Sequence, residues 1–388
     1  MTKLEELIQE LCPDGVEFCP LEQCCNILDK KRKPVTKSAR EAGDYPYYGA
    51  NGIQDYVSDY IFDGTFILVG EDGSVITDRG TPVVTWASGK IWVNNHAHII
   101  EESGDVLLRY LYHYIQTIDV SPLIHGNIPK LTGGDFKALQ IPVPPLPVQR
   151  EIVRILDNFT ELTAELTAEL TARKQQYAYY RDKLLHNATT TVYKRLGDFC
   201  DLLSGFPFDS SKFKEDGIRL MRGMNIKRGY LDFAEENNRY WESTDGIEKY
   251  LLNDQDIVIS MDGSLVGSSY GMVSKKDLPL LLVQRVTRIR TNQANIRYVY
   301  HYIASGRFTE YVHKKKTAGA IPHISLKDIF NFEVPLPSLE VQKRLVEVLD
   351  NFDAICSDLK IGLPAEIEAR QKQYEYYRDK LLTFTPAD

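Results

Sequence analysis

The chain contains an internal repeat that involves both of its halves. Residues 126–159 return as residues 319–352 at a constant offset of 193, and residues 172–185 return as residues 369–382 at an offset of 197. Weaker matches lie upstream, where RYLYHYI at 109–115 matches RYVYHYI at 297–303 and DGSV at 72–75 matches DGSL at 262–265. A repeat of this length means that one structural plan occurs twice. The sequence therefore predicts a pseudo-twofold chain with two unlike globular parts and two similar helical parts.

The length of the chain is consistent with this division. At 388 residues it is longer than one hydrophobic core usually organises. We place the globular parts at 1–143 and 194–336, and the helical parts at 144–193 and 337–388. The predicted fold class is α+β, with two mixed α/β domains joined by two long antiparallel helices that form a coiled coil.

The helical parts are predicted from the spacing of their apolar residues. In the first copy Val148, Ile152 and Ile155 follow the three-and-four spacing of one packed helix face, and the tetrapeptide TAEL occurs twice within 163–170. Each helical part has one dominant apolar stripe and therefore needs a partner. The other copy is the nearest candidate, and the long domain between the copies permits antiparallel packing. In the second copy the sequence IGLP at 361–364 predicts a kink or an interruption.

The globular parts carry clusters of basic residues in predicted loops, among them 30–33 and 313–316. Such clusters usually form a solvated surface, but beside Gly, Asn, Gln and Tyr they also suit contact with phosphates and polar recognition of bases. The net charge of −8 argues against a simple basic nucleic-acid binder. From composition alone, DNA binding and a merely solvated surface remain equally open.

Motifs of catalysis are absent from the sequence. It contains no GxxxxGK[ST] phosphate loop, no GxSxG nucleophile turn and no HExxH zinc motif. His96 and His98 form an HxH pair without an evident carboxylate or thiol partner, which favours polar loop contacts or buried, hydrogen-bonded rings. A zinc site at Cys19, Cys24 and Cys25 is a minor alternative to reduced, packed thiols. We predict a non-catalytic chain that holds no metal.

The sequence also lacks signals for a membrane or for secretion. Its start is an acidic amphipathic segment without the apolar core of a signal peptide. No apolar run approaches the roughly 20 residues that a bilayer span requires. We expect a cytoplasmic protein.

Three segments with their second copies resemble the specificity (S) subunits of Type I restriction–modification systems, the HsdS family. They are IPVPPLPVQREIVRILDNF at 141–159, the TAEL tetrapeptides at 163–170 and RKQQYAYYRDKLL at 173–185. Parts of both globular regions look similar as well, including YYGANGI at 47–53 and GFPF at 205–208. The likeness extends over nearly the whole chain, in the order domain, helix, domain, helix. The departure is the insertion around 362–364, which puts a continuous second helix in doubt.

The resemblance implies a concrete function. Each globular part would be a target recognition domain for one half of a split site in double-stranded DNA. The paired helices would set the gap between the halves and dock two methyltransferase (M) subunits, and motor-nuclease (R) subunits would join the larger complex. S-adenosylmethionine, ATP and Mg²⁺ would be cofactors of those partners and not of this chain. The residues themselves leave a second function open, a coiled-coil adaptor whose two modules bind proteins, which strongly salt-dependent, sequence-specific DNA binding would exclude.

Site candidates follow from the predicted loops and from the surplus of aromatic residues in the helices. Candidates for contact with bases are Asn51, Ser74, Asn94, Asn95, His98, Ser204, Arg222, Asn225, Ser264, Gln284 and Arg285. Candidates for contact with phosphates are Lys31, Arg32, Lys33, Lys314, Lys315 and Lys316. Candidates for contact with a protein partner are Tyr177, Tyr179, Tyr180, Tyr374, Tyr376 and Tyr377.

Overall fold

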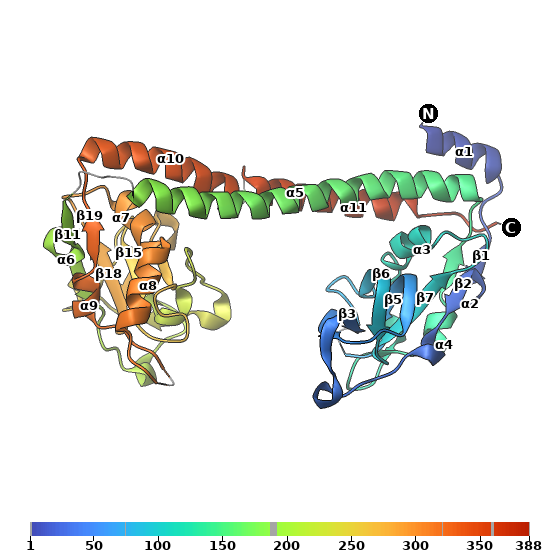
Figure 1. Cartoon of the computed structure of the whole chain (residues 1–388), viewed down its shortest axis with the longest axis horizontal. Helices are drawn as coiled ribbons and strands as arrows, with labels where there is room; N and C mark the ends of the chain where they lie inside the picture. The colour runs from blue at the N-terminus through green and yellow to red at the C-terminus, as the bar shows by residue number, and fades with distance from the viewer. Residues whose placement is uncertain (1, 74, 187–191, 320, 358–360, 388) are drawn as a thin grey trace. The chain divides into compact units, whose positions relative to one another are not determined.

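Two compact units make up the chain in the computed structural model (Figure 1), which describes all residues except 1, 74, 187–191, 320, 358–360 and 388. The first unit comprises Met1–Thr167 with Glu366–Asp388, and the second comprises Ala168–Ala365. Each unit therefore contains one globular part and a portion of the helical part of both copies. The boundaries drawn from the sequence separate globular from helical parts, which is a different division, and they stay predictions.

A six-stranded sheet of order β2-β7-β5-β6-β3-β4 forms the centre of the first unit. Along β5, Ile67 and Val69 point to the core beneath helix α3, whereas Phe66 and Leu68 point to a second core on the other face. This alternation is the period of two that a strand imposes. The elements of this unit are α1 (Lys3–Leu11), β1 (Phe18–Pro20), α2 (Leu21–Cys24), β2 (Cys25–Ile27), β3 (Ala42–Gly49), β4 (Gly52–Val57), β5 (Phe62–Gly70), β6 (Val84–Val93), β7 (Ala97–Glu102), α3 (Leu108–Ile115), β8 (Ile124–His125), β9 (Lys130–Leu131), α4 (Gly133–Lys137), β10 (Gln140–Pro142), the first part of α5 (Leu146–His186) and α11 (Leu363–Leu381), most of which belongs to this unit.

The second unit has a four-stranded sheet of order β12-β18-β15-β16 and a three-stranded sheet of order β14-β13-β17. Ile257 and Ile259 of β15 face the core under α7, and Val258 faces the core shared with β13 and β17. The elements are the last part of α5, β11 (Tyr193–Arg195), α6 (Leu196–Phe199), β12 (Asp201–Ser204), β13 (Ile218–Met221), β14 (Tyr240–Trp241), β15 (Ile257–Ser260), β16 (Tyr270–Met272), β17 (Leu280–Leu282), β18 (Val286–Arg290), α7 (Ile296–Ile303), α8 (Gly306–Lys315), α9 (Leu326–Phe330), β19 (Glu333–Pro335) and α10 (Leu339–Ser357).

The two units share one topology. The order β2-β7-β5-β6 in the first corresponds to β12-β18-β15-β16 in the second, and all of these neighbours pair antiparallel. The small sheets β1-β10 and β11-β19 correspond in the same way, and so do helices α3 and α7. The predicted repeat of one α+β plan is therefore confirmed, although the globular sequences have diverged.

Within the first unit, α5 and α11 run in opposite directions. The rings of Phe159 and Tyr377 stack with centroids 5.4 Å apart. The segment at 16–17 joins the other ends of the two helices. The N–H of Val16 donates to the oxygen of Thr385, which follows α11, at 2.9 Å, and the N–H of Val143, which precedes α5, donates to the oxygen of Glu17 at 2.9 Å. The end of α11 therefore lies beside the start of α5.

The same arrangement occurs in the second unit between α5 and α10. Tyr180 stacks on Phe352 with centroids 6.3 Å apart. The N–H of Leu336, just before α10, donates to the oxygen of Val192, which follows α5, at 3.0 Å. The antiparallel pairing predicted from the apolar stripes thus occurs inside each unit.

The helical part of the second copy is interrupted, as the sequence IGLP predicted. Helix α10 ends at Ser357 and α11 begins at Leu363, and the described residues Ile361 and Gly362 between them are not helical. Pro364 stands in the first turn of α11, where the missing N–H of a proline costs nothing. None of the helices in the described ranges has both the length and the apolar character that a membrane span requires.

Candidate nucleic-acid interface

Two repeated segments of the first unit meet at one end of the sheet. The N–H of Gly73 donates to the oxygen of Pro129 at 3.0 Å, and Asp72 forms an isolated bridge with Lys130. The loop between β6 and β7 joins them, because the His96 ring bonds to the Asp72 carboxylate. Asn95 and His96 are exposed on this loop. Loops 71–73, 94–96 and 129–131 therefore form one polar cluster, which we call loop cluster 1.

The second unit has an equivalent cluster. The N–H of Gly263 donates to the oxygen of Pro322 at 3.1 Å, and Asp262 forms an isolated bridge with His323. Arg285 lies 3.3 Å from Asp262 and 3.4 Å from the His323 ring. Its φ of +67° is a conformation that non-glycine residues rarely adopt, so the surrounding contacts must hold this exposed cation in place. Loops 261–265, 284–285 and 317–323, as far as they are described, form loop cluster 2.

Exposed candidates from the sequence lie in or near these clusters. Asn95 belongs to loop cluster 1, and Ser264, Gln284 and Arg285 belong to loop cluster 2. The lysines at 314–316 end α8 and lead into loop cluster 2. Helix α8 begins beside Asp182 of α5, since a Cβ on Gly306 would lie 3.6 Å from that carboxylate. Helix α8 runs away from α5 (Figure 1), and its ten residues advance about 15 Å, so these lysines lie on the side of the unit away from α5.

The clusters contain three residues that were not among the DNA-contact candidates from the sequence: Lys130, His323 and His96, which was considered only as a member of the HxH pair. Lys130 and His323 occupy equivalent positions of the repeat at the offset of 193. This equivalence was the signal in the sequence that could have identified them. Polar residues that differ in charge at matched loop positions are typical of contacts that differ between the two domains.

Several candidates are held inside the units. Asn94, His98 and Asn225 are buried, and each is hydrogen-bonded to neighbouring protein groups. Arg32 donates to Glu71 at 2.6 Å and to the oxygen of Ala97 at 2.7 Å, and Arg222 donates to the oxygen of Asn237 at 2.6 Å. These five side chains therefore bond within the protein in this structure, and their contact with DNA stays a prediction.

The remaining candidates have mixed positions. Lys31, Lys33 and Asn51 are exposed, with Asn51 at the turn between β3 and β4. The hydroxyl of half-buried Ser204 faces the sulfur of Met261 at 4.0 Å. Ser74 lies outside the described residues.

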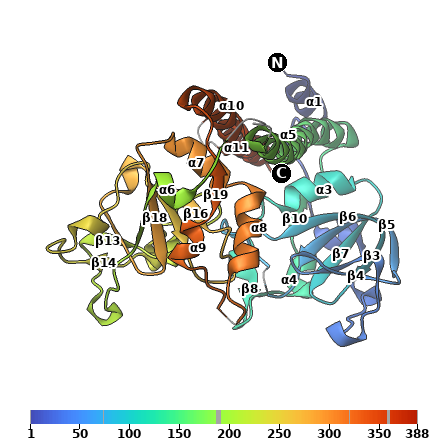
Figure 2. The same ribbon diagram turned by 60° about the vertical axis from the view of Figure 1, so that its left-hand side comes forward.

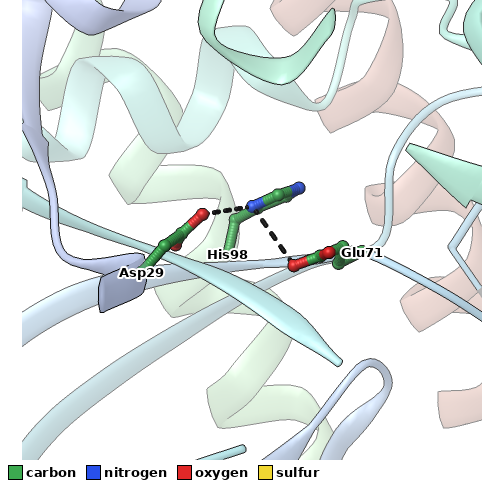
Figure 3. A group of neighbouring side chains, drawn as sticks. All are labelled: Asp29, Glu71 and His98. Atoms are coloured by element: carbon green, nitrogen blue, oxygen red, sulfur yellow. Dashed lines mark hydrogen bonds and ion pairs between the residues drawn. The ribbon is translucent and has the colours of Figure 1, made fainter. Parts of the chain in front are cut away.

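His98 belongs to a buried ion-pair network with Asp29 and Glu71 (Figure 3). Its Nδ1 lies 2.6 Å from Asp29 and 3.7 Å from Glu71, and its Nε2 lies 3.1 Å from the oxygen of Leu131. Both ring nitrogens thus lie within hydrogen-bond distance of oxygen atoms. These carboxylates are remote in the sequence, so the statement that the HxH pair has no evident carboxylate partner was wrong.

The charges of this network suit an ion-pair cluster better than a metal site. Arg32 and Lys130 reach Glu71 at 2.6 and 3.1 Å. Burial is the largest single influence on Asp29 and would raise its pKa. The hydrogen bonds from His98 and from the N–H of Ile99, together with nearby positive charge, outweigh burial and leave that pKa below its ordinary value. At Glu71 burial is again the largest single influence, but the hydrogen bonds from Arg32 and Lys130 and the nearby positive charge together outweigh it and lower the pKa. Cations of the chain already neutralise both carboxylates, so the network fastens loop cluster 1 to β7.

The cysteines of the minor zinc alternative have unsuitable chemistry. The Cys25 thiol donates to the oxygen of Leu21 at 3.2 Å, and the Cys24 thiol lies 3.5 Å from the oxygen of Pro20. Burial raises the pKa of Cys24 to about 11 and that of Cys25 to about 12. In this packing both thiols are therefore protonated and hydrogen-bonded to the backbone, as packed, reduced cysteines are.

Comparison with known families decides the identity of the chain. Residues 13–173 and 189–369 each match the family model described as Type I restriction modification DNA specificity domain. The chain belongs to this family. Its role is that of a DNA-specificity subunit of a Type I restriction–modification complex.

Individual relatives agree with this assignment. The specificity subunit is 33% identical over 408 residues to a putative type I restriction enzyme specificity subunit of Haemophilus influenzae, with 99% of both chains aligned. It is 35% identical over 325 residues to the EcoR124I/EcoR124II specificity subunit of Escherichia coli, with 80% of each aligned. The fold is similar to the S subunit from M. genitalium, with a TM-score of 0.54, 15% identity and coverage of 95% and 96%. A second similar structure, described in terms of complex assembly and conformational transition of the type I R-M system, has a TM-score of 0.58 and 16% identity, with 95% of this chain and 98% of that chain aligned.

Three repeated motifs of the specificity subunit meet in one buried network in the first unit. Nε2 of His113 in α3 donates to Asp157 of α5 at 2.8 Å, and the Tyr374 hydroxyl of α11 bonds to its Nδ1 at 2.9 Å. Arg109 donates to the same carboxylate at 2.7 Å. A carboxylate can only accept, so the neutral ring donates through Nε2 and accepts from the tyrosine. The motifs RYLYHYI, LDNF and QYEYYRDKLL are therefore explained by structure.

The second unit contains the same network with the copies exchanged. His301 of α7 bonds to Asp350 of α10 at 2.6 Å and to the Tyr177 hydroxyl of α5 at 3.1 Å, and Arg297 donates to Asp350 at 3.1 Å. In each unit the histidine and the carboxylate come from one copy and the tyrosine from the other. We call these assemblies the interlocks. Each globular part is thus fastened to a helix that belongs to the other half of the sequence.

The interlocks change the interpretation of the tyrosine clusters. Tyr177 and Tyr374 bond to histidines, and Tyr180 and Tyr377 stack on phenylalanines of the same unit. These four side chains therefore make contacts within their own unit, although Tyr180 is still 39% exposed, and contact of the four with a protein partner stays a prediction. Tyr179 and Tyr376, at equivalent positions, remain well exposed and keep the candidate role.

The histidines of the interlocks should make the protein less stable as the pH falls below about 6.5. Burial lowers the pKa of both His113 and His301 below the ordinary value of 6.5, despite their carboxylate partners. The unfolded chain therefore takes up protons first as the pH falls below about 6.5, and stability declines toward pH 5 but is flat for these groups above pH 7. We expect a lower midpoint of thermal unfolding at pH 5.5 than at pH 7.5, and a smaller difference in the variant His113→Gln with His301→Gln. If the midpoints of that variant at the two pH values differ as much as those of the unmodified chain, the pH dependence comes from groups other than these two histidines.

Proposed function

We propose that each loop cluster recognises one half of a two-part DNA site. The observation that supports this is the repetition of one scaffold with unlike side chains. Loop cluster 1 has exposed Asn95 and His96 beside half-buried Lys130, and loop cluster 2 has exposed Ser264 and Arg285 beside half-buried His323. Exposed amides, hydroxyls and a held arginine are suitable donors and acceptors for base edges. Because the two sets differ, the two half-sites should differ in sequence.

We further propose that the helices set the gap between the half-sites and dock two methyltransferase subunits, with motor-nuclease subunits joining the complex. One of the similar structures is described in terms of complex assembly of the type I R-M system, which supports a multi-subunit setting. In this proposal methylation and ATP-dependent cleavage occur in those partners, which bring S-adenosylmethionine, ATP and Mg²⁺. The complex would act in the cytoplasm on double-stranded DNA.

DNA recognition is tested by binding of the purified complex with its methyltransferase subunits to duplex DNA. We expect affinity that falls steeply with salt and that survives competition by unrelated duplex. Equal affinity for all duplexes would favour the adaptor function instead. So would a chain that forms stable complexes with proteins and does not bind DNA.

The lysines at the end of α8 should contribute affinity without specificity. We expect Lys316→Ala to weaken DNA binding similarly for all sequences and to reduce the salt slope by about one, since it removes one phosphate contact. Binding isotherms at several salt concentrations measure both quantities. Lys372→Ala, which removes a lysine of α11 paired with Glu368, serves as the control and should leave the slope unchanged. A changed target sequence in Lys316→Ala would contradict the assignment.

A further inference from the structure

The residues directly before β7 and β18, the equivalent strands of the two sheets (Figure 2), are His96 and Arg285. The N–H of Glu71, just after β5, donates to the oxygen of His96 at 2.8 Å. The N–H of Met261, just after β15, donates to the oxygen of Arg285 at the same distance of 2.8 Å. The two residues are 189 positions apart and not 193, so the repeat in the sequence does not align them. In the structure, however, they occupy one position of the shared scaffold.

Each of these side chains is held by the aspartate that begins a DGS segment. The His96 ring bonds to Asp72. Nη1 of Arg285 lies 3.3 Å from Asp262 and 3.4 Å from Nδ1 of His323. The side chains of His96 and Arg285 are 47% and 60% exposed, whereas those of the two aspartates are 25% and 27% exposed. In both units a half-buried carboxylate therefore anchors an exposed side chain that carries nitrogen donors.

The contacts of Arg285 leave most of its guanidinium group available. Its bonds to Asp262 and His323 use Nη1, and within the described parts of the chain Nε and Nη2 have no hydrogen-bond partner. Donors in this planar fork match N7 and O6 of a guanine in the major groove of DNA. Glycine would adopt the φ of +67° with less strain, and an exposed ion pair adds little stability. Stability alone therefore does not explain an arginine at this position.

We propose that positions 96 and 285 are matched base-reading positions, and that Arg285 reads a guanine in the second half-site. Asp72 and Asp262 are positioning residues, because they order the reading side chain before DNA binds and so reduce the entropy lost on binding. This inference rests on the proposed recognition of a two-part DNA site. An imidazole anchored through Nδ1 has one nitrogen left, whereas the arginine presents a fork, so the base read at this position differs between the half-sites.

The variant Arg285→Ala, in the complex with the methyltransferase, tests the reading role. We expect one guanine of the second half-site to lose its specification, with discrimination at that base pair reduced roughly five- to 150-fold and the first half-site unchanged. Arg285→Lys keeps the charge but not the fork, and should lose the same discrimination. His96→Ala should relax one position of the first half-site alone. Arg307→Ala, which removes an exposed arginine near the start of α8, is the matched control and should leave both half-sites as they are.

Two measurements report these effects. Mapping of methylated sites shows which position changes, and competition binding with duplexes that differ by one base pair gives the discrimination even where methylation is slow. Relaxation at a base pair other than G·C, at several positions or at none would overturn the reading role of Arg285. If the unmodified complex shows no two-part site at all, the proposed function itself fails, and that outcome is distinct.

The variant Asp262→Ala tests the positioning role. It loosens Arg285 without removing it, so we expect a smaller loss at the same base pair and no further loss there when it is combined with Arg285→Ala. Asp262→Asn, whose amide oxygen can still accept a hydrogen bond, should retain more of the discrimination than Asp262→Ala. A loss that falls on other base pairs, or that adds to the loss in Arg285→Ala, would show that Asp262 does not act through Arg285.

Discussion

Insertion of one further TAEL after Leu170 is expected to lengthen the gap in the methylated DNA site and to leave both half-sites unchanged. Four residues extend a helix by about 6 Å and rotate it about 40° beyond a full turn. DNA advances about 3.4 Å per base pair along each strand, so we expect a gap longer by about one to two base pairs. Helix α5 runs without interruption through the TAEL tetrapeptides, and the boundary between the compact units falls among them, at Thr167 and Ala168. The insertion therefore leaves the cores and the interlocks of both units intact.

The control for this experiment keeps the length of the helix and changes its sequence. Replacement of residues 167–170 by four alanines should leave the gap as it is, because alanine favours the helix and the side chains there are largely exposed. The methylated sites of the three chains are mapped in cells that carry the methyltransferase partner. Altered half-sites with a constant gap would contradict the view that α5 acts as the spacer.

Asp157→Ala is expected to lower the free energy of unfolding by about 2–3 kcal/mol, the range for losing hydrogen bonds to charged groups when one partner is removed. The substitution leaves Arg109 and the buried His113 without their shared acceptor. The expected loss is smaller than the roughly 3–5 kcal/mol for breaking a fully buried ion pair, because the Asp157 side chain is 37% exposed and partly screened by water. Asp350→Ala should have a comparable effect in the second unit.

Unfolding in denaturant, followed by a probe in each unit, measures this prediction. Asn158→Ala, the exposed neighbour of Asp157, is the matched control and should change stability by less than about 0.5 kcal/mol. Tyr374→Phe should have a smaller effect than Asp157→Ala, because the phenol donates one neutral hydrogen bond. An Asp157→Ala chain as stable as the Asn158→Ala chain would show that the interlock does not hold the globular part to its helices.

The helical plan was predictable from the sequence because its signals are local or repeated. The spacing of Val148, Ile152 and Ile155 indicated a helix face, and the glycine and proline of 362–364 indicated the interruption that the structure contains. The matching blocks indicated two copies of one topology, which the strand orders confirm. These features depend on neighbours within a few turns of the chain, or on direct comparison of one half with the other.

The loop assignments were less predictable because they depend on burial and on remote partners. Asn94 and Asn95 are adjacent and chemically identical, yet one is buried in a turn and the other is exposed. His98 bonds to Asp29 and lies beside Glu71, which are distant in the sequence and become its neighbours only when β2 and β5 pair with β7. The tyrosines at 177 and 374 exceeded the needs of one helix seam, but the histidines that use them come from the other copy.

Sequencing of the methylated bases in cells that carry this chain with its methyltransferase partner is the sharpest test of two-part recognition. We predict one asymmetric site, with two unlike specified halves separated by a fixed stretch of unspecified bases. A contiguous site, a palindromic site or methylation independent of sequence would contradict it.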